Sequence, residues 1–497
     1  MKVRSKRLGS GERGLITEES LADFGTRGMG VYADEVNLAR AVPDIMDGLK
    51  PVQRRILWAA SKLGKDMVKT ARVVGETVGK YHPHSDASVS DSITVLVNSN
   101  VPTFRGEGNW GSLIDPAGAI RYTNCTLSAY GWAGFFDPNY ISKEVTPFVP
   151  NYDDKTVEPV TLPALLPNVI LNGSSGIGVG TTTNLPSFTP ESVVLILKRL
   201  LAGERLAPLD FAKTLKYQYK YGGRPVKSKE NAQGWMELFK APSARVVFEA
   251  SLVIDKDHKA IEIDDWPYGL DPVKFITKVR TFPEVDQAYN NKGATGFRIE
   301  MRRDHNYAQF DKLVEKVQKA TQVARSFKIN VTHRKSSVVD GVVSMTTEYL
   351  NLTVPKLIVT WLRHRVELEK ASLQNRILNQ QSAIDYSELL IFVAKNADAL
   401  IKVIRTSTDP EADLMKVFKL SELQAKQVLD LQLRKISKLD QTKVLEALKE
   451  QRADLKQLEL WLKKPKQKVM DDCDQVLKAI EADRKFEAAK DRKMKVK

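Results

Sequence analysis

Two long helical repeats in the last third of the chain constrain the fold more than any other feature of the sequence. In the second repeat the apolar residues are separated by four, seven, three and four positions, and charged residues fill the gaps. Such spacing is typical of helices that pair along one seam. The repeats comprise Leu357, Trp361, Leu368, Leu373, Ile377 and Ile384, and then Val444, Leu448, Leu455, Leu458 and Leu462. Because residues 386–437 separate them, the sequence predicts an antiparallel coiled coil that carries a globular tip.

The predicted tip is rich in apolar residues, and a small knob needs fewer of them for its own core. We interpret the tip as a self-association surface, with a purely internal core as the alternative. The residues concerned are Leu429, Leu431, Leu433, Ile436 and Leu439. Basic and acidic residues alternate after Pro465, so we expect residues 463–497 to form a frayed helix or a disordered charged tail.

Composition favours a polyanionic partner and a reducing compartment. The 497 residues suffice for about three domains, and 76 Lys and Arg against 61 Asp and Glu give a net charge of +15. Neutralised phosphates release counterions and drive binding, although an unrelated basic protein is the alternative. Two cysteines, Cys125 and Cys473, exclude a disulfide scaffold and a cysteine-rich zinc site. The N-terminus lacks a signal-peptide pattern and no segment reaches membrane-spanning length, so we expect a cytoplasmic protein without a membrane partner.

The N-terminal third combines short helices with a glycine-rich segment. Residues 1–30 mix basic side chains with glycines, which predicts either a flexible arm along a phosphate backbone or a tip without a role. Helices are expected at 31–41, from Pro51 to Gly64, and at 68–79. With the extended segment 101–124 they predict a helix-turn-helix with a wing, rather than an all-helical unit without DNA. The cations that favour DNA are Lys50, Arg54, Arg55, Lys65, Lys69, Arg72 and Lys80.

The middle of the chain, residues 187–345, alternates strand-like and helical patterns and predicts an α+β domain. The strand-like pieces are 245–254, 259–263 and 296–300, and the helices are expected at 189–202, 271–280 and 308–320. Asp264 and Asp265 could bind a metal, but a lone acidic pair is more often a turn or a cap.

Arg121 and Tyr122 form the candidate reactive pair. A tyrosine hydroxyl, with a pKa of about 10, is a poor nucleophile unless its oxyanion is stabilised. A neighbouring guanidinium can hold the phenolate or a phosphate oxygen. The pair suits attack on a phosphodiester, which exchanges one phosphate ester for another and can be reversed without a new energy source. For any one of the 14 tyrosines, a packing role is the alternative.

Two further motifs carry candidate contacts. His82 and His84 flank a proline, and because no other ligand cluster lies nearby, hydrogen bonds to phosphate are favoured over a metal site. The glycine-rich run 172–180 lacks the Gly-Lys-Ser/Thr of a phosphate loop, and the next helix begins too late to bind phosphate. It fits a close-approach loop that presents Ile177, either as a wedge between stacked bases or as a turn packed on the protein itself.

Over about residues 30–460 these motifs resemble the breakage–reunion subunit of type IIA DNA topoisomerases, the gyrase A and topoisomerase IV C class. The resemblance is carried, in family order, by 40–55 (Arg-Ala-Val-Pro-Asp-Ile-Met-Asp-Gly-Leu-Lys-Pro-Val-Gln-Arg-Arg), 71–75 (Ala-Arg-Val-Val-Gly), 79–84 (Gly-Lys-Tyr-His-Pro-His), 107–112 (Glu-Gly-Asn-Trp-Gly-Ser), 121–123 (Arg-Tyr-Thr) and 172–180 (Asn-Gly-Ser-Ser-Gly-Ile-Gly-Val-Gly). The chain stops without the β-pinwheel domain of gyrase A, a layout similar to the medium subunit of T4-type phage enzymes. This favours a phage enzyme that relaxes and decatenates DNA.

The resemblance implies a multidomain α+β fold. The expected parts are a basic arm (1–30), a winged-helix cleavage domain (31–165), a tower domain (166–345), a coiled coil with a dimerisation tip (346–462) and a charged tail (463–497). It also implies an ATP-dependent enzyme that passes one DNA duplex through a transient staggered break in another.

The resemblance also assigns residue roles. Tyr122 would form a 5′-phosphotyrosyl link, and Arg121 and Arg40 would stabilise the transition state. Ile177 would bend the duplex. The family positions expected to hold the DNA backbone are Lys50, Arg54, Arg55, His82 and His84, and the cations Lys69, Arg72 and Lys80 join them as candidate DNA contacts.

Partners follow from what the sequence lacks. It contains neither the Glu…Asp-x-Asp cluster that holds Mg²⁺ in Toprim domains nor an ATP-binding loop. The resemblance therefore implies a homodimer on double-stranded DNA with a gyrase B-like ATPase/Toprim subunit that supplies Mg²⁺ and ATP. The chain alone should bind DNA but cleave weakly or not at all, and no metal ligand is assigned to it.

Three positions depart from the family pattern. Ser85 replaces a usual glycine, and Ala87 replaces the serine that contacts quinolones, whereas Asp91 keeps the acidic partner position. We expect reduced quinolone sensitivity, which an Ala87→Ser variant should restore. Asn124 stands where a glutamate often occurs, and the sequence gives no reason for it.

Two rival functions come from other classes. A non-catalytic DNA-bending scaffold of the same fold would need neither Arg121 nor Tyr122. A nuclease that uses metal-bound water would need a local carboxylate cluster, which the sequence lacks.

Overall fold

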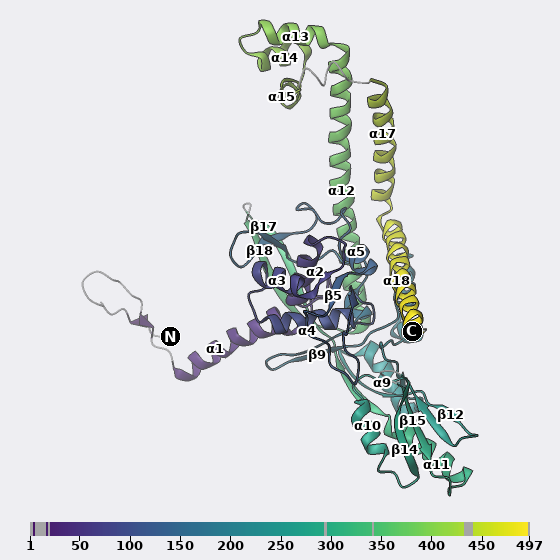
Figure 1. The fold of residues 1–497 in the computed structure, drawn as a ribbon. Helices are drawn as coiled ribbons and strands as arrows, with labels where there is room; N and C mark the ends of the chain where they lie inside the picture. The colour runs from purple at the N-terminus through teal and green to yellow at the C-terminus, as the bar shows by residue number, and fades with distance from the viewer. Residues whose placement is uncertain are drawn as a thin grey trace. The chain divides into compact units, whose positions relative to one another are not determined.

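A computed structural model describes residues 3–4, 16–17, 20–292, 296–339, 342–431 and 441–495. The chain divides into two units, residues 1–365 with 470–497 and residues 366–469. Both helices and sheets build the first unit, and helices build the second (Figure 1). The predicted mixed α+β class is therefore confirmed.

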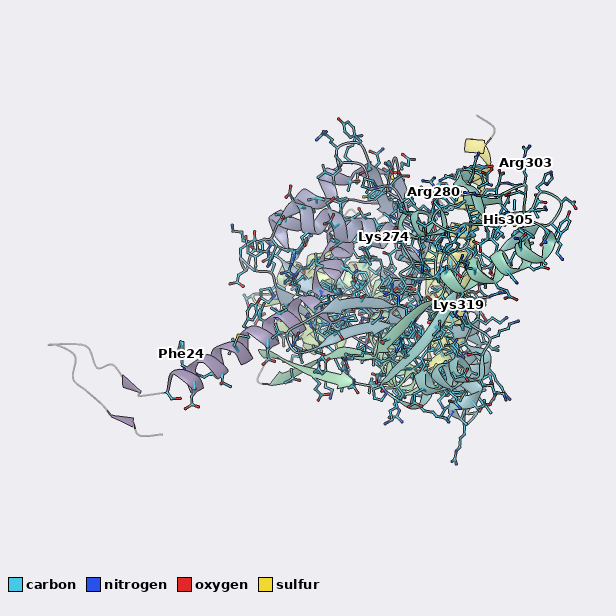
Figure 2. All side chains as sticks on the ribbon, turned by 90° about the horizontal axis from the view of Figure 1, so that it is seen from below. Phe24, Lys274, Arg280, Arg303, His305 and Lys319 are labelled. Carbon is cyan, nitrogen blue, oxygen red and sulfur yellow. The ribbon has the colours of Figure 1, made fainter. Side chains whose placement is uncertain are left out.

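The chain begins with β1 (Val3–Arg4) paired to β2 (Ile16–Thr17), followed by α1 (Leu21–Val36) and the π-helical turn η1 (Asn37–Ala41). Helix thus starts about ten positions before the predicted 31–41, and the flexible-arm prediction is wrong from Leu21 onward; positions 1–2, 5–15 and 18–19 lie outside the described residues. The side chain of Ser20 accepts the N–H of Asp23, and this N-cap offsets the glycines within α1. Phe24 on α1 is exposed (Figure 2).

The next elements form a small helical and sheet assembly. They are α2 (Pro51–Lys62), β3 (Val68–Lys69), α3 (Thr70–Lys80), α4 (Asp86–Val97), β4 (Phe104–Glu107), β5 (Asn124–Leu127) and α5 (Ala129–Phe135). The strands pair in the order β3-β5-β4. Pro51 begins α2 as predicted, and Gly64 follows it at φ 89°, a left-handed conformation that suits glycine. Ile56, Val73 and Ile93 are fully or almost fully buried, so the three helices share one core.

The middle of the chain contains two antiparallel sheets. One has the order β10-β11-β16-β9-β8 and the other β12-β13-β15-β14. The strands are β8 (Ser174–Ile177), β9 (Thr182–Leu185), β10 (Arg224–Pro225), β11 (Ser243–Glu249), β12 (Val253–Asp255), β13 (Ala260–Ile263), β14 (Val285–Lys292), β15 (Gly296–Met301) and β16 (Val323–Lys328). The predicted strand 245–254 is therefore two strands, which belong to different sheets. Asp265 accepts the N–H of Gly223, so it serves a turn, the commoner role of such a residue.

Six helices among the described residues accompany these sheets. They are α6 (Asn168–Leu171), α7 (Pro190–Leu201), α8 (Pro208–Thr214), α9 (Lys229–Lys240), α10 (Pro272–Val279) and α11 (Tyr307–Ala320). Of these, α7, α10 and α11 lie close to the three predicted positions, whereas α6, α8 and α9 were not predicted. Two hairpins complete the unit, β6 (Phe148–Pro150) with β7 (Val157–Pro159) and β17 (Asn330–Val339) with β18 (Val342–Asn351). Basic side chains of the α10 and α11 region include Lys274, Arg280, Arg303, His305 and Lys319 (Figure 2).

The second unit contains the predicted antiparallel helix pair. Most of α12 (Val354–Lys395) runs beside α17 (Gln441–Lys463): Gln380 donates to the carbonyl of Gln451 at 3.0 Å, and Arg452 pairs with Glu388 at 2.6 Å. The tip consists of α13 (Ala397–Thr406), α14 (Pro410–Phe418) and α15 (Glu422–Asp430). Leu400, Leu414 and Val428 belong to its core, and Leu431 packs against that core. Leu429 is exposed, while Leu433, Ile436 and Leu439 lie outside the described residues.

The charged end of the chain forms a helix, α18 (Pro465–Lys495). The prediction of a frayed or disordered tail is wrong because this helix buries one face: Cys473, Val476 and Ile480 are 2% exposed or less. Its Asp472 pairs with the buried Arg365 at 2.6 Å and accepts the hydroxyl of Tyr140 at 2.9 Å. The alternating charges after Pro465 therefore belong to an amphipathic helix, which the charge pattern alone did not indicate.

Candidate nucleic-acid interface

Tyr122 is held by its backbone while its side chain stays exposed. Its N–H donates to the carbonyl of Ala119 at 2.9 Å, and 68% of the residue is accessible to solvent. The guanidinium carbon of Arg121 lies 4.7 Å from the centre of the tyrosine ring. Gly108 adopts φ 93°, and a Cβ at this position would lie 3.0 Å from the Tyr122 carbonyl oxygen. The loop after β4 thus passes closely over the backbone of an accessible tyrosine.

The start of α3 lies beside this tyrosine. The N–H of Thr70 donates to the carbonyl of Thr123 at 3.1 Å, and the two threonine hydroxyls are 2.8 Å apart. Lys69, one position earlier, pairs with Asn124 across the sheet, and both Lys69 and Arg72 are exposed. Two predicted DNA-binding cations therefore occupy the segment that borders the tyrosine.

Asn124 has a charged neighbour on each side in the sheet. Glu107 of β4 lies opposite it, with the Asn124 amide nitrogen 3.5 Å from the Glu107 carboxylate, and Lys69 of β3 lies opposite it on the other side. A glutamate in place of Asn124 would therefore meet a like charge on β4 and an opposite charge on β3.

The far end of α3 leads into a second cluster, in which Arg55 and His82 are joined. Arg55 Nη1 lies 3.1 Å from His82 Nδ1, and Arg55 Nη2 donates to Glu158 at 2.7 Å. Because a guanidinium only donates, Nδ1 of His82 accepts and its ring proton sits on Nε2. Nε2 thus retains the N–H that could donate to a phosphate.

The environment keeps His82 neutral. Burial lowers its pKa to about 4, and the nearby His84, Arg55 and Arg40 contribute to this shift. The His82 and His84 rings stack with centroids 4.1 Å apart. The structure therefore brings Arg40, which was predicted to stabilise the transition state, close to three residues predicted to hold the DNA backbone, Arg55, His82 and His84.

The hairpin β8–β9 adjoins this cluster. Lys50 Nζ donates to the Ser175 carbonyl at 2.6 Å, and burial lowers the pKa of this lysine. The side-chain amide of Asn37 binds both backbone groups of Val179, with its oxygen 2.9 Å from the nitrogen and its nitrogen 3.0 Å from the carbonyl oxygen. Ile177 is 85% exposed, although the turn that carries it packs on the protein through Val179 and Asn37. Its action as a wedge stays a prediction.

Glycine is required on this hairpin for steric reasons. A Cβ at Gly176 would lie 2.1 Å from the carbonyl oxygen of Ala41, and a Cβ at Gly178 would lie 1.9 Å from the Asn37 side-chain oxygen. The glycine-rich run therefore lets the hairpin press against η1, which carries Arg40.

Arg54 occupies a different environment from its neighbours. It is 3% exposed, and its Nε and Nη2 donate to the two oxygens of Asp47 at 2.5 and 2.9 Å. Its guanidinium is thus turned into the protein, so the structure does not support Arg54 as a direct DNA contact. The sequence could not distinguish it from Arg55, because both carry the same charge in the same helix.

Sequence reasoning missed several framework residues around Arg54. Burial and the neighbouring Asp47 raise the pKa of Asp44 to about 6, and Asp44 accepts the backbone N–H of Arg334 at 3.0 Å. Arg334 in turn donates to the carbonyl of Leu38 at 3.2 Å and supports the turn that carries Arg40. Asp44 lies within the 40–55 motif, so the sequence could have marked it as a candidate. No pattern in the sequence connects Arg334 with this motif.

The remaining predicted residues lie on α3 and α4. Lys80 pairs with Glu76 at 2.8 Å, and both Ala87 and Asp91 are exposed. A cleft of about 830 Å³ is lined by Arg40, Lys50 and Asp91, among others. Asp91 therefore lines the same cleft as Arg40 and Lys50, and its drug-contact role stays a prediction.

The candidate residues form two groups at opposite ends of α3. We call Lys69, Thr70 and 121–123 the tyrosine end, and Arg40, Arg55, His82 and His84 the histidine end. Since α3 has 11 residues, its ends are about 15 Å apart. Among the described residues, no hydrogen bond, ion pair or ring contact joins Arg121 or Tyr122 to the histidine end.

Two features are absent from the part of the chain that the structure describes. No group of three or more His, Cys, Asp or Glu side chains is arranged to hold a metal ion in these ranges. No helix among the described residues has the length and apolarity needed to span a bilayer.

Fold and site define a class: a multidomain α+β chain that presents an arginine–tyrosine pair on a small sheet beside a basic cluster. Residues 40–476 match the family model for the A subunit of DNA gyrase/topoisomerase IV. The chain therefore belongs to this family.

Individual relatives agree with this assignment. The DNA gyrase A protein of Campylobacter fetus is 33% identical over 442 residues, which cover 84% of this chain and 49% of the relative. The chloroplastic/mitochondrial DNA gyrase A protein of Nicotiana benthamiana is 32% identical over 485 residues, covering 92% and 49% respectively. The DNA gyrase A protein of Helicobacter pylori is 30% identical over 438 residues, covering 84% and 50%. The chain spans about half the length of these relatives.

Proposed function

We propose that this chain is the DNA-cleaving and religating subunit of an ATP-dependent type II topoisomerase. The observation that carries the proposal is Tyr122, an exposed hydroxyl on a backbone fixed by β5 and by the loop after β4. Its oxygen would attack a backbone phosphorus, the bond from phosphorus to the 3′ oxygen would break, and a free 3′-hydroxyl would leave with the proton. The product is a 5′-phosphotyrosyl link, and the reverse attack by the 3′-hydroxyl restores the DNA.

Charge around the tyrosine supports this chemistry. Arg121 lies close enough to stabilise the negative charge that develops during attack, an electrostatic role that needs no movement at the moment of reaction. Exposed Lys69 and Arg72 would hold the flanking phosphates, and Ile177 would bend the duplex.

The separation along α3 supports the predicted homodimer. A phosphate attacked by Tyr122 lies about 15 Å from the histidine end of the same chain, by the rise of α3. Arg40 and His82 would therefore act on that phosphate from a second copy, one tyrosine serving each strand of a staggered break. The helical tip, with Leu429 exposed, would supply the lasting contact between copies.

The domain roles follow from this proposal. The assembly of α2, α3 and α4 with the sheet β3-β5-β4 would be the winged-helix cleavage domain, and the two larger sheets would form the tower. Mg²⁺ and ATP would be supplied by a gyrase B-like partner. Relaxation and decatenation, a phage origin and reduced quinolone sensitivity at Ala87 stay predictions.

The test mixes the chain with an ATPase/Toprim subunit, Mg²⁺ and an end-labelled duplex, and quenches the reaction with detergent. Label should become attached to the protein, and Tyr122→Phe should abolish this attachment while DNA binding persists. The matched control is Tyr307→Phe, which removes a hydroxyl from another exposed tyrosine, 58% accessible. A wild-type chain that binds and bends DNA without ever capturing label would instead establish the non-catalytic scaffold.

A further inference from the structure

The carboxylate of Asp483, on the C-terminal helix α18, binds two elements of the cleavage region. Its Oδ1 accepts Arg105 Nε at 2.8 Å and the backbone N–H of Ala129 at 3.0 Å, and its Oδ2 accepts the N–H of Tyr130 at 2.8 Å. Arg105 Nη2 adds a fourth contact at 2.7 Å, and only 10% of the Asp483 side chain is exposed. One charge thus joins segments more than 350 positions apart in sequence.

These contacts flank the strand that follows Tyr122. Arg105 lies on β4 and pairs with Thr126 on β5, whereas Ala129 and Tyr130 begin α5, directly after β5 ends. β5 is therefore held from its neighbouring strand and from the helix behind it. Gly108 directly follows β4, and a Cβ at this position would lie only 3.0 Å from the Tyr122 carbonyl oxygen, so a shift of β4 would displace the loop that passes the tyrosine backbone.

At this point polar contacts add to the apolar packing of α18, whose Ile480 is 2% exposed. A cleft of about 650 Å³ is lined by Gly106, Gly108 and Trp110 of the loop and by Asp483 and Glu487 of α18. Beside the cleft, the Arg105 guanidinium lies 4.5 Å from the centre of the Phe486 ring. Beside this cleft, the ion pair joins α18 to β4, and the two backbone hydrogen bonds join α18 to the start of α5.

We propose that Asp483 is a positioning residue for the cleavage reaction: it fixes β4 and the start of α5 so that Tyr122 is correctly placed for attack. The inference rests on the proposed function of Tyr122. A nucleophile displaced by about 1 Å loses up to about 100-fold in rate, so a distant anchor of its strand has a measurable effect.

The test variant is Asp483→Asn. All four contacts to Asp483 come from donors, and an amide offers one acceptor oxygen and two donor hydrogens, so at least one donor faces another donor. The matched control is Asp474→Asn, the same substitution on the same helix. Asp474 is 45% exposed and pairs with Lys198 at 2.6 Å, and Lys198 lies on α7, outside the β4–β5 assembly.

Each chain is combined with the partner subunit, Mg²⁺ and saturating duplex. The measurements are the single-turnover rate of covalent attachment per folded chain, the DNA dissociation constant without Mg²⁺, and the thermal midpoint. For Asp483→Asn we expect the cleavage rate to fall about tenfold, with the DNA dissociation constant changed less than about twofold, whereas Asp474→Asn should match the wild type. A cleavage rate per folded chain equal to that of the wild type would overturn the inference, because a purely structural role changes only the folded fraction.

A second variant tests the same inference in case Asp483→Asn does not fold. Arg105→Gln removes the ion pair but leaves both hydrogen bonds that Asp483 accepts from the backbone of α5, and its cleavage rate should fall about threefold. A wild-type rate in this variant would count against the inference. The wild-type chain reports separately on the proposed function: if it captures DNA covalently, Tyr122 chemistry stands whether or not the Asp483 variants differ from it.

Discussion

The two ends of α3 carry similar residues but differ in how exposed and how firmly held their side chains are. At the tyrosine end, Tyr122 is 68% exposed and Arg121 touches only its ring among the described contacts. At the histidine end, the ion pair of Arg55 with Glu158 and the hydrogen bond to His82 lock the side chains in place. A nucleophile must reach a substrate that arrives from solution, whereas a phosphate-binding group gains from being fixed beforehand.

Electrostatics distinguishes the ends in the same way. Below the histidine end, Asp47 neutralises the buried Arg54, and Arg334 lies among the same charges, where burial and the nearby Arg54 lower its pKa to about 10. Lys69 of the tyrosine end and the nearby Arg72 are exposed, and no buried ion pair supports either of them in the described contacts. Cations that are close in sequence therefore have two different roles. Some, such as Arg54, form a buried ion-pair platform under the site, and others face the ligand.

Removing the buried member of the platform should have the largest effect. Arg54→Ala leaves the Asp47 carboxylate uncompensated in the core, and we expect a loss of about 3–5 kcal/mol in the free energy of unfolding, measured by chemical denaturation. The matched control is Lys80→Ala, which removes an exposed, surface-paired cation and should leave the free energy of unfolding close to that of the wild type. If Arg54→Ala were as stable as the control yet bound DNA poorly, Arg54 would be a ligand contact after all.

At the tyrosine end, Arg121→Ala should impair chemistry without destabilising the fold. The loss of a cation that stabilises developing charge typically costs about 100- to 1000-fold in rate, and we expect a reduction of this order in the rate of covalent attachment. The thermal midpoint should remain that of the wild type because Arg121 is exposed. A proportionate loss of DNA affinity would assign Arg121 to binding and not to the reaction.

The histidine end should respond to pH. Because the pKa of His82 is about 4 in the folded chain against 6.5 when unperturbed, the unfolded chain binds a proton between these values that the folded chain does not. The free energy of unfolding should therefore fall as pH drops from 6.5 to 4. His82→Asn should reduce this slope and match the wild-type slope above pH 7, where the group is neutral in both states. His364, whose pKa burial also lowers to about 4, retains part of the slope in the variant. An unchanged slope would show that His82 titrates normally in the fold.

The smallest expected effect concerns the strand beside Tyr122. Asn124→Glu places a carboxylate opposite both Glu107 and Lys69, so the repulsion is partly offset and should cost at most about 0.2–1 kcal/mol in the free energy of unfolding. The loss should shrink at high ionic strength because screening weakens repulsion between exposed charges. A loss that does not depend on salt would point to packing in place of repulsion.

Local patterns in the sequence were enough for much of the fold. Pro51 and Gly64 bound a helix in the structure as their conformational preferences predict, and the heptad spacing around Leu448 and Leu458 corresponds to a paired helix. Errors arose where distant parts of the chain decide the outcome. α18 reads as a charged tail because its apolar face is narrow, and it is buried by residues far away in sequence, such as Tyr140.

The same division holds for the site. Residue types alone revealed the available chemistry, an arginine–tyrosine pair and a basic cluster, because residue type fixes charge and nucleophilicity. Which of these groups face solvent depends on the packing of the folded chain. Arg54 and Arg55 are neighbours in one helix, yet burial against Asp47 turns one inward, while the other reaches His82. Exposure and partners depend on what packs against each face of an element, and that information is spread over residues as distant as Asp483 and Tyr130.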